Sequence, residues 1–226
     1  MRMNRRTALT LLGAGAGYAY LGAPQTVFGQ DAGPVLNIAL DQVPAALDPL
    51  LGQTNPYYRT LQNVYDTLLT VDYLGDGSLQ PALAESWTRV DGKTLELKLR
   101  QGVKFHDGSA LTTDDVIFSF GETRRTSKDS PGFGTAQQFL RTIATVEAID
   151  DTTIRVTSST DDPTLELRLT AWGSQIVSKA AFETAGGFEG FGRAPIGTGP
   201  FSVVSLSPDV LELKAFADYW NGKPDI

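Results

Sequence analysis

Three pairs of adjacent aspartates come closest, by residue type and spacing, to acid–base chemistry. The pairs are Asp114-Asp115, Asp150-Asp151 and Asp161-Asp162. Two carboxylates catalyse bond cleavage when they converge in space, whereas the side chains of chain neighbours usually diverge. The first pair lies in the first turn of a predicted helix, the second lies at a turn, and the third precedes a proline as a helix N-cap does. The sequence therefore predicts structural roles for these pairs and no catalytic residue.

Metal and nucleophile chemistry are limited by the residue types present. His106 is the single histidine of the chain, and there is no cysteine. A site of several histidines, or one with a cysteine ligand, cannot be built from this chain alone. There is no Gly-x-Ser-x-Gly elbow, and Gly197-Thr198-Gly199 is too short for a phosphate loop. We predict that the protein is not an enzyme, binds no metal and requires no cofactor.

The composition excludes two classes of partner. The 226 residues are 41% hydrophobic and 20% charged, which is ordinary for a globular protein of one or two domains. The formal net charge is −7. Nucleic-acid binding requires a basic face, so this acidic balance predicts no nucleic-acid partner. It also disfavours adsorption to an anionic membrane.

Residues 1–29 have the pattern of an export signal. Arg5-Arg6 precede an apolar run that is diluted by glycines, which is typical of a twin-arginine signal. An ordinary secretory signal that happens to carry two arginines is the alternative. The run is too short to span a bilayer. We expect cleavage after Gly29, a periplasmic or other extracytoplasmic location, and no lipid anchor, because the chain has no cysteine.

The elements that would position a site are clearest between residues 81 and 120. Asp91-Gly92 predicts the tight turn of a β-hairpin. In its second strand Leu95, Leu97 and Leu99 alternate with charged residues, which indicates one buried and one solvated face. A helix should follow, because Thr112 and Asp115 have the spacing of a capping box. The basic residues after it, Arg124, Arg125 and Lys128, are expected at a solvated helix end.

Patterning predicts further elements on both sides of this block. The predicted strands and hairpins are a short apolar strand at 35–40, a strand from 71 into a turn, a hairpin of 143–149 with 152–157, and a hairpin of 201–206 with 210–217. The predicted helices are 57–69, 136–141, a short one opened by Asp162-Pro163, and 176–182.

Several motifs resemble the family 5 solute-binding proteins, the extracellular receptors of ABC importers for peptides, nickel and some oligosaccharides. The matching segments are 83–87 (LAESW), 97–100 (LKLR), 102–108 (GVKFHDG), 111–116 (LTTDDV), 195–201 (PIGTGPF) and 218–223 (DYWNGK). Their order and spacing both fit the family. The resemblance covers about residue 35 to the end and corresponds to the N-terminal portion of the family.

The resemblance implies an α/β fold: one lobe of a class II periplasmic binding protein, with a mixed sheet, helices and a smaller hairpin-rich subdomain. In these terms residues 30–226 form the N-terminal lobe. Residues 35–70 and 180–226 would make one subdomain, and residues 71–179 an inserted one. Family members are longer, so we expect the second lobe to be missing and this chain to be a fragment with half a site, which binds mixed peptides without tight affinity.

The resemblance also implies a function. A monomeric receptor captures a small solute, with a peptide as the expected ligand, and two lobes close on it so that ABC permease subunits in the membrane recognise the closed form. Two alternatives remain. One is a sensory or chaperone-like binding module with the same fold, which would lack neighbouring permease genes. The other is a secreted hydrolase.

Six residues are candidates for ligand contact. In the resembled family the first strand leads into a loop beside the ligand cleft with an Asp-Pro pair, which here is Asp48-Pro49. The loop and the helix after it supply Asp48, Gln53, Thr54, Tyr57 and Tyr58, and Trp172 beside Gly173 could line a cleft. A helix N-terminus favours anionic groups. The alternatives are a solvated turn for the loop and simple packing for the aromatic residues.

Overall fold

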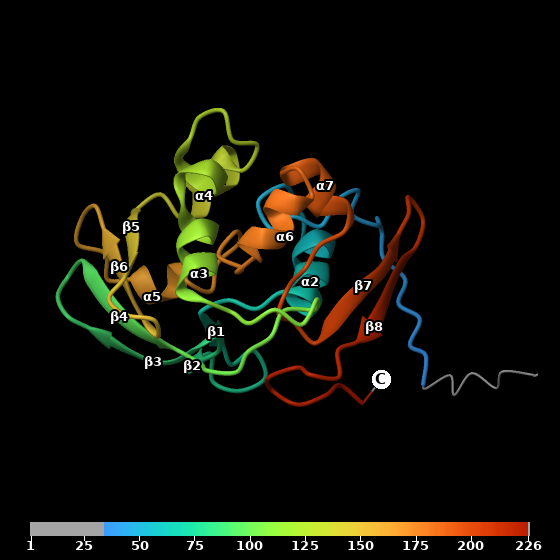
Figure 1. Cartoon of the computed structure of the whole chain (residues 1–226), viewed down its shortest axis with the longest axis horizontal. Helices are drawn as coiled ribbons and strands as arrows, with labels where there is room; N and C mark the ends of the chain where they lie inside the picture. Colours follow the sequence, from blue (N-terminus) through green and yellow to red (C-terminus); the bar gives the residue numbers. More distant parts are fainter. Residues whose placement is uncertain (1–33, 226) are drawn as a thin grey trace, which may run out of the picture. The chain divides into compact units, whose positions relative to one another are not determined.

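The predicted hairpin that carries Leu95, Leu97 and Leu99 in its second strand forms part of a four-stranded antiparallel sheet. The structure is a computed structural model that describes residues 34–225. The sheet has the order β3 (Ala84–Arg89), β4 (Thr94–Leu99), β6 (Thr153–Ser158) and β5 (Ile143–Ala148) (Figure 1). In the register Leu97 on β4 lies between Trp87 on β3 and Ile154 on β6. The predicted burial of Leu95, Leu97 and Leu99 is confirmed, because none is more than 2% exposed.

The described part of the chain otherwise consists of short helices and two small sheets. The strands are β1 Leu69–Val71, β2 Leu79–Pro81, β3 Ala84–Arg89, β4 Thr94–Leu99, β5 Ile143–Ala148, β6 Thr153–Ser158, β7 Phe201–Leu206 and β8 Leu211–Ala215. The helices are α2 Asn55–Val64, α3 Thr113–Phe120, the π-helical turn η1 Glu122–Thr126, α4 Phe133–Phe139, α5 Leu165–Arg168, α6 Lys179–Thr184 and α7 Phe188–Arg193. The α/β class is confirmed. The five described strand pairs are all antiparallel, where a mixed sheet was expected, because each pair joins hairpin neighbours or returns beside β4.

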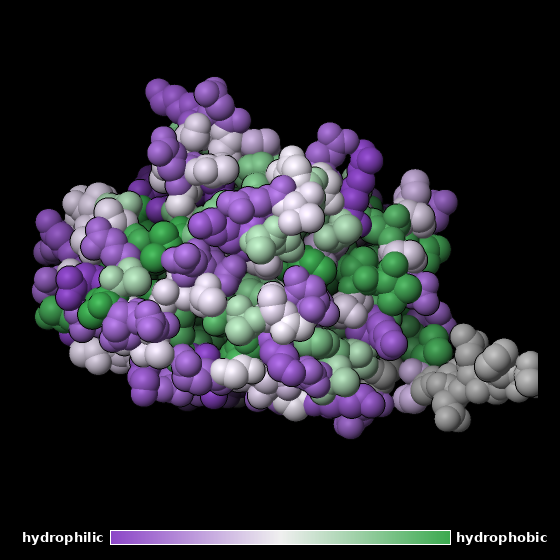
Figure 2. All heavy atoms as spheres, viewed as in Figure 1, coloured by the Kyte–Doolittle hydropathy of each residue, from purple (hydrophilic) through white to green (hydrophobic). Residues whose placement is uncertain are grey.

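Two hydrophobic clusters organise these elements. The first joins the sheet, α3 and α5, with buried residues that run from Leu68 to Ile176. The second joins α2, α6 and α7, and the β7–β8 hairpin packs on it. In Figure 1 the β3–β6 sheet and the β7–β8 hairpin lie at opposite ends, with α2, α3 and α6 between them. In Figure 2 apolar atoms gather over that hairpin, where Val204 and Val210 are exposed.

Helix α3 begins as the capping-box spacing predicts. The Asp115 carboxylate accepts hydrogen bonds from the Thr112 backbone N–H at 3.0 Å and from the Thr112 hydroxyl at 2.7 Å. Its other oxygen accepts from the Lys179 N–H at the start of α6, at 3.0 Å. Val116 and Phe120 are buried in the first cluster. One aspartate therefore caps α3 and also fixes where α6 begins.

Two sequence predictions along this region are wrong. Residues 35–40 form no strand. No described strand pairs with them, and the apolar side chains of Leu36 and Ile38 are 60% and 71% exposed. Helix α2 ends at Val64 rather than at residue 69, because the chain turns extended at Tyr65 and enters β1. Leu61, Val64, Tyr65 and Leu68 are all buried, as their spacing predicted. The first two lie in α2 and the other two in the segment after it, so the spacing did not require a longer helix.

The expectation of a solvated basic cluster after α3 is wrong for Arg124 and Arg125, whereas Lys128 is exposed as expected. Arg124 is 1% exposed and Arg125 3% exposed. The Arg125 guanidinium donates to the carbonyl oxygens of Phe120, Leu140 and Ile143 at 2.9–3.0 Å. Burial lowers the pKa of Arg125 to about 10. The π-helical turn η1 directs both side chains inward, so this basic dipeptide stabilises the interior instead of a helix end.

The sheet core predicts a difference between two chemically identical substitutions. Ile154→Val on β6 should lower the free energy of unfolding by about 1 kcal/mol, because it removes a methylene from a closely packed site. Ile149→Val, at a side chain 45% exposed in the turn after β5, should leave it nearly unchanged. Urea denaturation of both variants measures the difference. Equal losses would contradict the assignment of this face to the core.

Candidate functional site

The loop before α2 is anchored by a fully buried ion pair. Asp48 is 0% exposed, and its carboxylate accepts from Arg124 Nη1 at 2.6 Å and Nη2 at 3.1 Å. The same carboxylate accepts from the Leu50 N–H at 2.9 Å. Asp48 therefore presents no carboxylate oxygen to solvent. In this structure it holds the loop, and a solute at the surface does not reach it.

Arg124 is the partner that sequence reasoning missed. Its guanidinium packs against the rings of Phe182 on α6 and Phe188 on α7, 4.8 and 4.9 Å from their centroids. Its Nε has no hydrogen-bond partner among residues 34–225. An arginine beside a second arginine in a polar stretch gives no sequence signal of burial. The sequence feature that could have indicated this pair is Asp48, an acidic residue among mostly apolar neighbours. A carboxylate that is buried needs a cation beside it.

Tyr57 belongs to the same buried anchor. Its ring is buried and its hydroxyl donates to the Asp48 backbone carbonyl at 2.5 Å. Burial, with a contribution from the Asp48 charge, raises the pKa of Tyr57 well above its usual range. A Cβ atom at Gly52 would lie 2.5 Å from the Tyr57 ring, so glycine is required where the loop backbone crosses it. Tyr57 thus supports the loop from below as a neutral, buried side chain.

Tyr58 and Trp172 come together from segments more than one hundred residues apart. Their rings are nearly parallel, with an interplanar angle of 27° and centroids 5.2 Å apart. Phe139, at the end of α4, packs on Trp172 at 5.4 Å. The Tyr58 hydroxyl donates to the Thr170 carbonyl at 3.2 Å. Gly173 has φ +81°, which places the Trp172 loop in a conformation that favours glycine. We refer to Tyr58, Phe139 and Trp172 as the aromatic cluster.

Gln53 and Thr54 are exposed residues at the start of α2. The Gln53 amide donates to Thr135 Oγ1 at 3.0 Å, and that hydroxyl donates in turn to the Leu50 carbonyl at 2.7 Å. Thr54 occupies the N-cap position without a side-chain capping bond. Of the six predicted residues, Asp48 and Tyr57 therefore lie inside the protein. The other four are exposed or half-buried: Gln53, Thr54, Tyr58 and Trp172.

A second missed residue is Asp66, which follows α2. Its carboxylate accepts from the Thr198 hydroxyl at 2.9 Å, the Tyr219 hydroxyl at 3.1 Å and the Trp220 indole N–H at 2.9 Å. Burial raises the pKa of Asp66 to about 6 against the opposing effect of these donors. One carboxylate thus ties α2 to two distant motifs. His106 adds a further link, since its ring nitrogens bond the Gly197 N–H at 3.3 Å and the Gly199 carbonyl at 2.9 Å.

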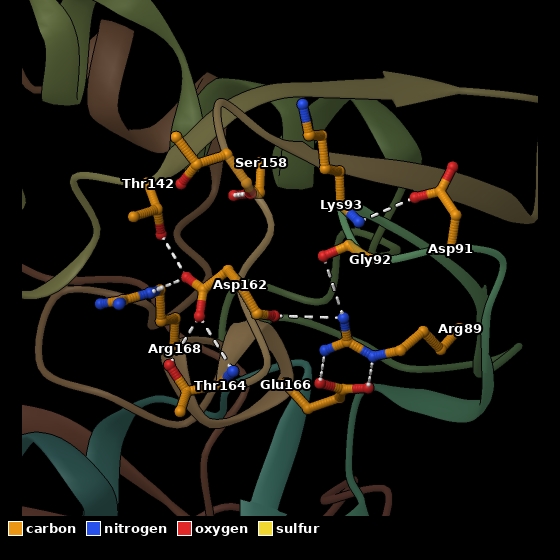
Figure 3. A network of polar contacts seen from close by, with 11 residues as sticks. Arg89, Asp91, Gly92, Lys93, Thr142, Ser158, Asp162, Thr164, Glu166 and Arg168 are labelled. Atoms are coloured by element: carbon orange, nitrogen blue, oxygen red, sulfur yellow. Dashed lines mark hydrogen bonds and ion pairs between the residues drawn. The ribbon is translucent and has the colours of Figure 1, made fainter.

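Asp162, from the third aspartate pair, lies in a structural network (Figure 3). The Asp162 carboxylate accepts from Thr142 at 2.6 Å, from Thr164 and from Arg168 Nε at 2.5 Å. Burial would raise the pKa of Asp162, but these hydrogen bonds together hold it well below its usual range. Arg89 forms a bidentate ion pair with Glu166 of α5. The network connects the β3–β4 hairpin to α5. The carboxylates of Asp162 and Glu166 are therefore hydrogen-bonded to groups of the protein itself.

The residues that the structure describes contain no group of three or more side chains suited to a metal ion. Likewise, none of the helices in residues 34–225 is both long enough and apolar enough to cross a bilayer. The arginine pair Arg5-Arg6 and the rest of the predicted signal at 1–29 lie outside the described residues.

Comparison with known proteins gives one family. The model of the bacterial extracellular solute-binding proteins, family 5, matches residues 78–226. Heme-binding protein A of Haemophilus influenzae is 32% identical over 204 residues, which cover 80% of this chain and 37% of that protein. The chain therefore spans little more than a third of the length of this relative.

Solved structures agree with that comparison. The binding protein MoaA of A. tumefaciens R10, in complex with mannopinic acid, matches with a TM-score of 0.69 at 34% identity. The match covers 79% of this chain and 36% of the MoaA chain. The ABC transporter-associated periplasmic binding protein DppA from Helicobacter pylori, in complex with the peptide STSA, has a TM-score of 0.69 at 28% identity. The match covers 79% of this chain and 38% of the DppA chain.

Proposed function

Because this chain belongs to the bacterial extracellular solute-binding proteins of family 5, as its motifs predict, we propose that it forms one wall of a solute-binding site that serves an ABC importer. The activity is capture without chemical change. Of the aspartates that could have suggested catalysis, Asp115 caps a helix, and Asp150 and Asp162 accept hydrogen bonds from protein donors.

The observation that carries this proposal is the aromatic cluster. Tyr58 and Trp172 form a stacked pair of half-buried rings, although they come from distant segments. The exposed Gln53 and Thr54 directly precede α2, and the Tyr58 N–H donates to the Thr54 carbonyl at 3.0 Å. Stacked rings supply rigid, amphipathic contact area at little cost in conformational entropy, and amides and hydroxyls supply hydrogen bonds. This combination suits a small organic solute.

The solute class is proposed from the relatives. The comparison proteins bind different molecules by their names: one heme, one mannopinic acid and one a peptide. We propose a peptide or similar small solute, because Gln53 and Thr54 offer neutral hydrogen-bonding groups of the kind that recognise peptide bonds. The formal net charge of −7 disfavours phosphate binding, so nucleic acid is not a proposed partner.

The remaining features are part of the same proposal. The protein is exported by the signal at 1–29 without a lipid anchor, acts as a monomer in the periplasm, and delivers its solute to permease subunits after closure around it. The subdomain division at 35–70 with 180–226, and 71–179, also stays a proposal. The two hydrophobic clusters support it, since one draws mainly on the inserted range and the other on the flanking ranges.

The test is fluorine NMR of the mature chain labelled with 5-fluorotryptophan. The chain has three tryptophans, and each resonance is assigned by substitution with phenylalanine. Millimolar Ala-Leu-Ala should shift the Trp172 resonance, because only this tryptophan stacks in the aromatic cluster. Trp87 and Trp220 pack against the sheet core and serve as internal controls.

Two results would count against the proposal. One is the absence of any Trp172 shift with a panel of peptides at millimolar concentration. The other is an equal shift of all three resonances, which indicates non-specific association. A Tyr58→Ala variant should reduce the response about five-fold or more, since loss of a stacking partner costs roughly 1 kcal/mol.

A further inference from the structure

A hollow of about 230 Å³ opens on the loop before α2, and all of its lining residues lie between 42 and 57. We call it the loop pocket. Its walls include Ala45, Ala46, Leu51, Gly52, Thr54 and Tyr57. It adjoins the exposed candidate Thr54, and its floor is the ring of Tyr57. The pocket therefore lies within the segment that carries most of the predicted ligand residues.

The chemistry of this lining is neutral and mostly apolar. No charged side chain contributes to it, and Gln42 and Thr54 supply its polar side chains. The acid of the same loop, Asp48, is turned away and bound to Arg124. The Tyr57 hydroxyl is likewise turned inward to the Asp48 carbonyl, so that the pocket meets the face of the ring. A charged group placed here would lose water without gaining a partner.

The pocket is held in shape by bonds that reach outside the loop. The Leu47 N–H donates to the Gly192 carbonyl at 2.7 Å, and the Leu47 carbonyl accepts from the Tyr65 hydroxyl at 2.9 Å. Gln53 is tied to Thr135 on α4. Together with the Asp48–Arg124 pair, these contacts fix the loop at residues 47, 48 and 53. A preformed apolar hollow binds more tightly than one that must be ordered on binding.

The volume decides what can enter. Pockets that enclose a whole small molecule usually measure on the order of 300–1,000 Å³. A cavity of about 150 Å³ already holds a benzene ring. At about 230 Å³ the loop pocket is too small for a whole peptide but large enough for one leucine-sized or phenylalanine-sized side chain.

We propose that the loop pocket is a subsite for one uncharged, apolar side chain of the solute. This inference rests on the proposed function and adds a specificity to it. The aromatic cluster and Gln53 contact the solute in general, whereas the loop pocket selects an aliphatic or aromatic side chain over a charged one of similar length.

The experiment compares two peptides that differ at one side chain. Ala-Leu-Ala and Ala-Lys-Ala are titrated into the mature chain with ¹³C-labelled alanine and leucine methyl groups, while the Trp172 fluorine resonance is followed in parallel. The methyl signals of Ala45, Ala46 and Leu51 should shift with Ala-Leu-Ala. We expect the leucine peptide to bind about ten-fold more tightly, as burial of an apolar side chain predicts.

A variant that fills the pocket separates this inference from general binding. Ala45 is exposed, so Ala45→Leu should fold normally, occupy the pocket and abolish the preference for the leucine peptide. Ala148→Leu, at an exposed alanine on β5, is the matched control and should keep the preference.

The outcomes are distinct. A Trp172 response to both peptides with no difference between them, or a preference that survives Ala45→Leu, overturns the subsite and leaves the proposed function standing. No response from Trp172 or from the pocket methyl groups overturns both.

Discussion

Replacing Arg124 by methionine should lower the free energy of unfolding by about 3–5 kcal/mol, the range measured when one partner of a buried ion pair is removed. The substitution leaves the Asp48 carboxylate inside the protein with the Leu50 N–H as its remaining donor. It also removes the cation that packs against the rings of Phe182 and Phe188. Urea denaturation at neutral pH measures the loss.

Two further variants make this result specific to the buried charge. Arg193→Met removes an arginine whose partner Glu189 is one helical turn away, with both side chains largely exposed, and should cost less than about 0.5 kcal/mol. The double variant Asp48→Asn with Arg124→Met leaves no buried charge at this site and should recover part of the loss. A loss for Arg124→Met no larger than that for Arg193→Met would show that Asp48 does not depend on this partner.

The second large effect is a pH dependence that comes from Asp66. Its pKa rises from 3.8 to about 6 on folding, so the folded state binds more protons than the unfolded state between these values. The stability contributed by this group is therefore complete below pH 4 and is lost as the pH rises through 6. A shift of this size corresponds to about 3 kcal/mol.

The measurement is a difference between two proteins. The free energy of unfolding of the wild type minus that of Asp66→Asn should fall by about 2.5 kcal/mol between pH 4 and pH 7.5, since the other titrating groups cancel in the difference. Asp150→Asn is the control. Hydrogen bonds from Thr152 lower the pKa of Asp150, so its difference should change mainly below pH 4 and stay nearly flat between pH 4 and pH 7.5. A flat difference for Asp66 would mean that the carboxylate is not buried in solution.

Local structure was largely predictable from the sequence. The hairpins at 84–99 and 143–158 and the capped start of α3 depend on contacts between near neighbours, namely turn residues, alternation and a capping spacing of three. Such signals act within a few residues, so they can be read without knowledge of the rest of the fold. The motifs within these elements were also sufficient to predict the family, which the comparison with known proteins confirms.

The candidate site was only partly predictable. The segments that carry Gln53, Thr54, Tyr58 and Trp172 were identified, but nothing in their spacing shows that Tyr58 stacks on Trp172. The strand expected at 35–40 shows the same limit. An apolar alternating segment becomes a strand only where another strand supplies hydrogen bonds, and pairing is a long-range property.

By itself the sequence determined the acidic, cysteine-free character of this protein, its family and the hairpins and capped helix of its core. Only the tertiary structure decided that Asp48 and Arg124 meet inside the protein, that Asp66 gathers three distant donors, and that the residues before α2 enclose a neutral pocket. The physical reason is that burial sets the energy of a charge, and burial depends on chain segments that are far apart in sequence.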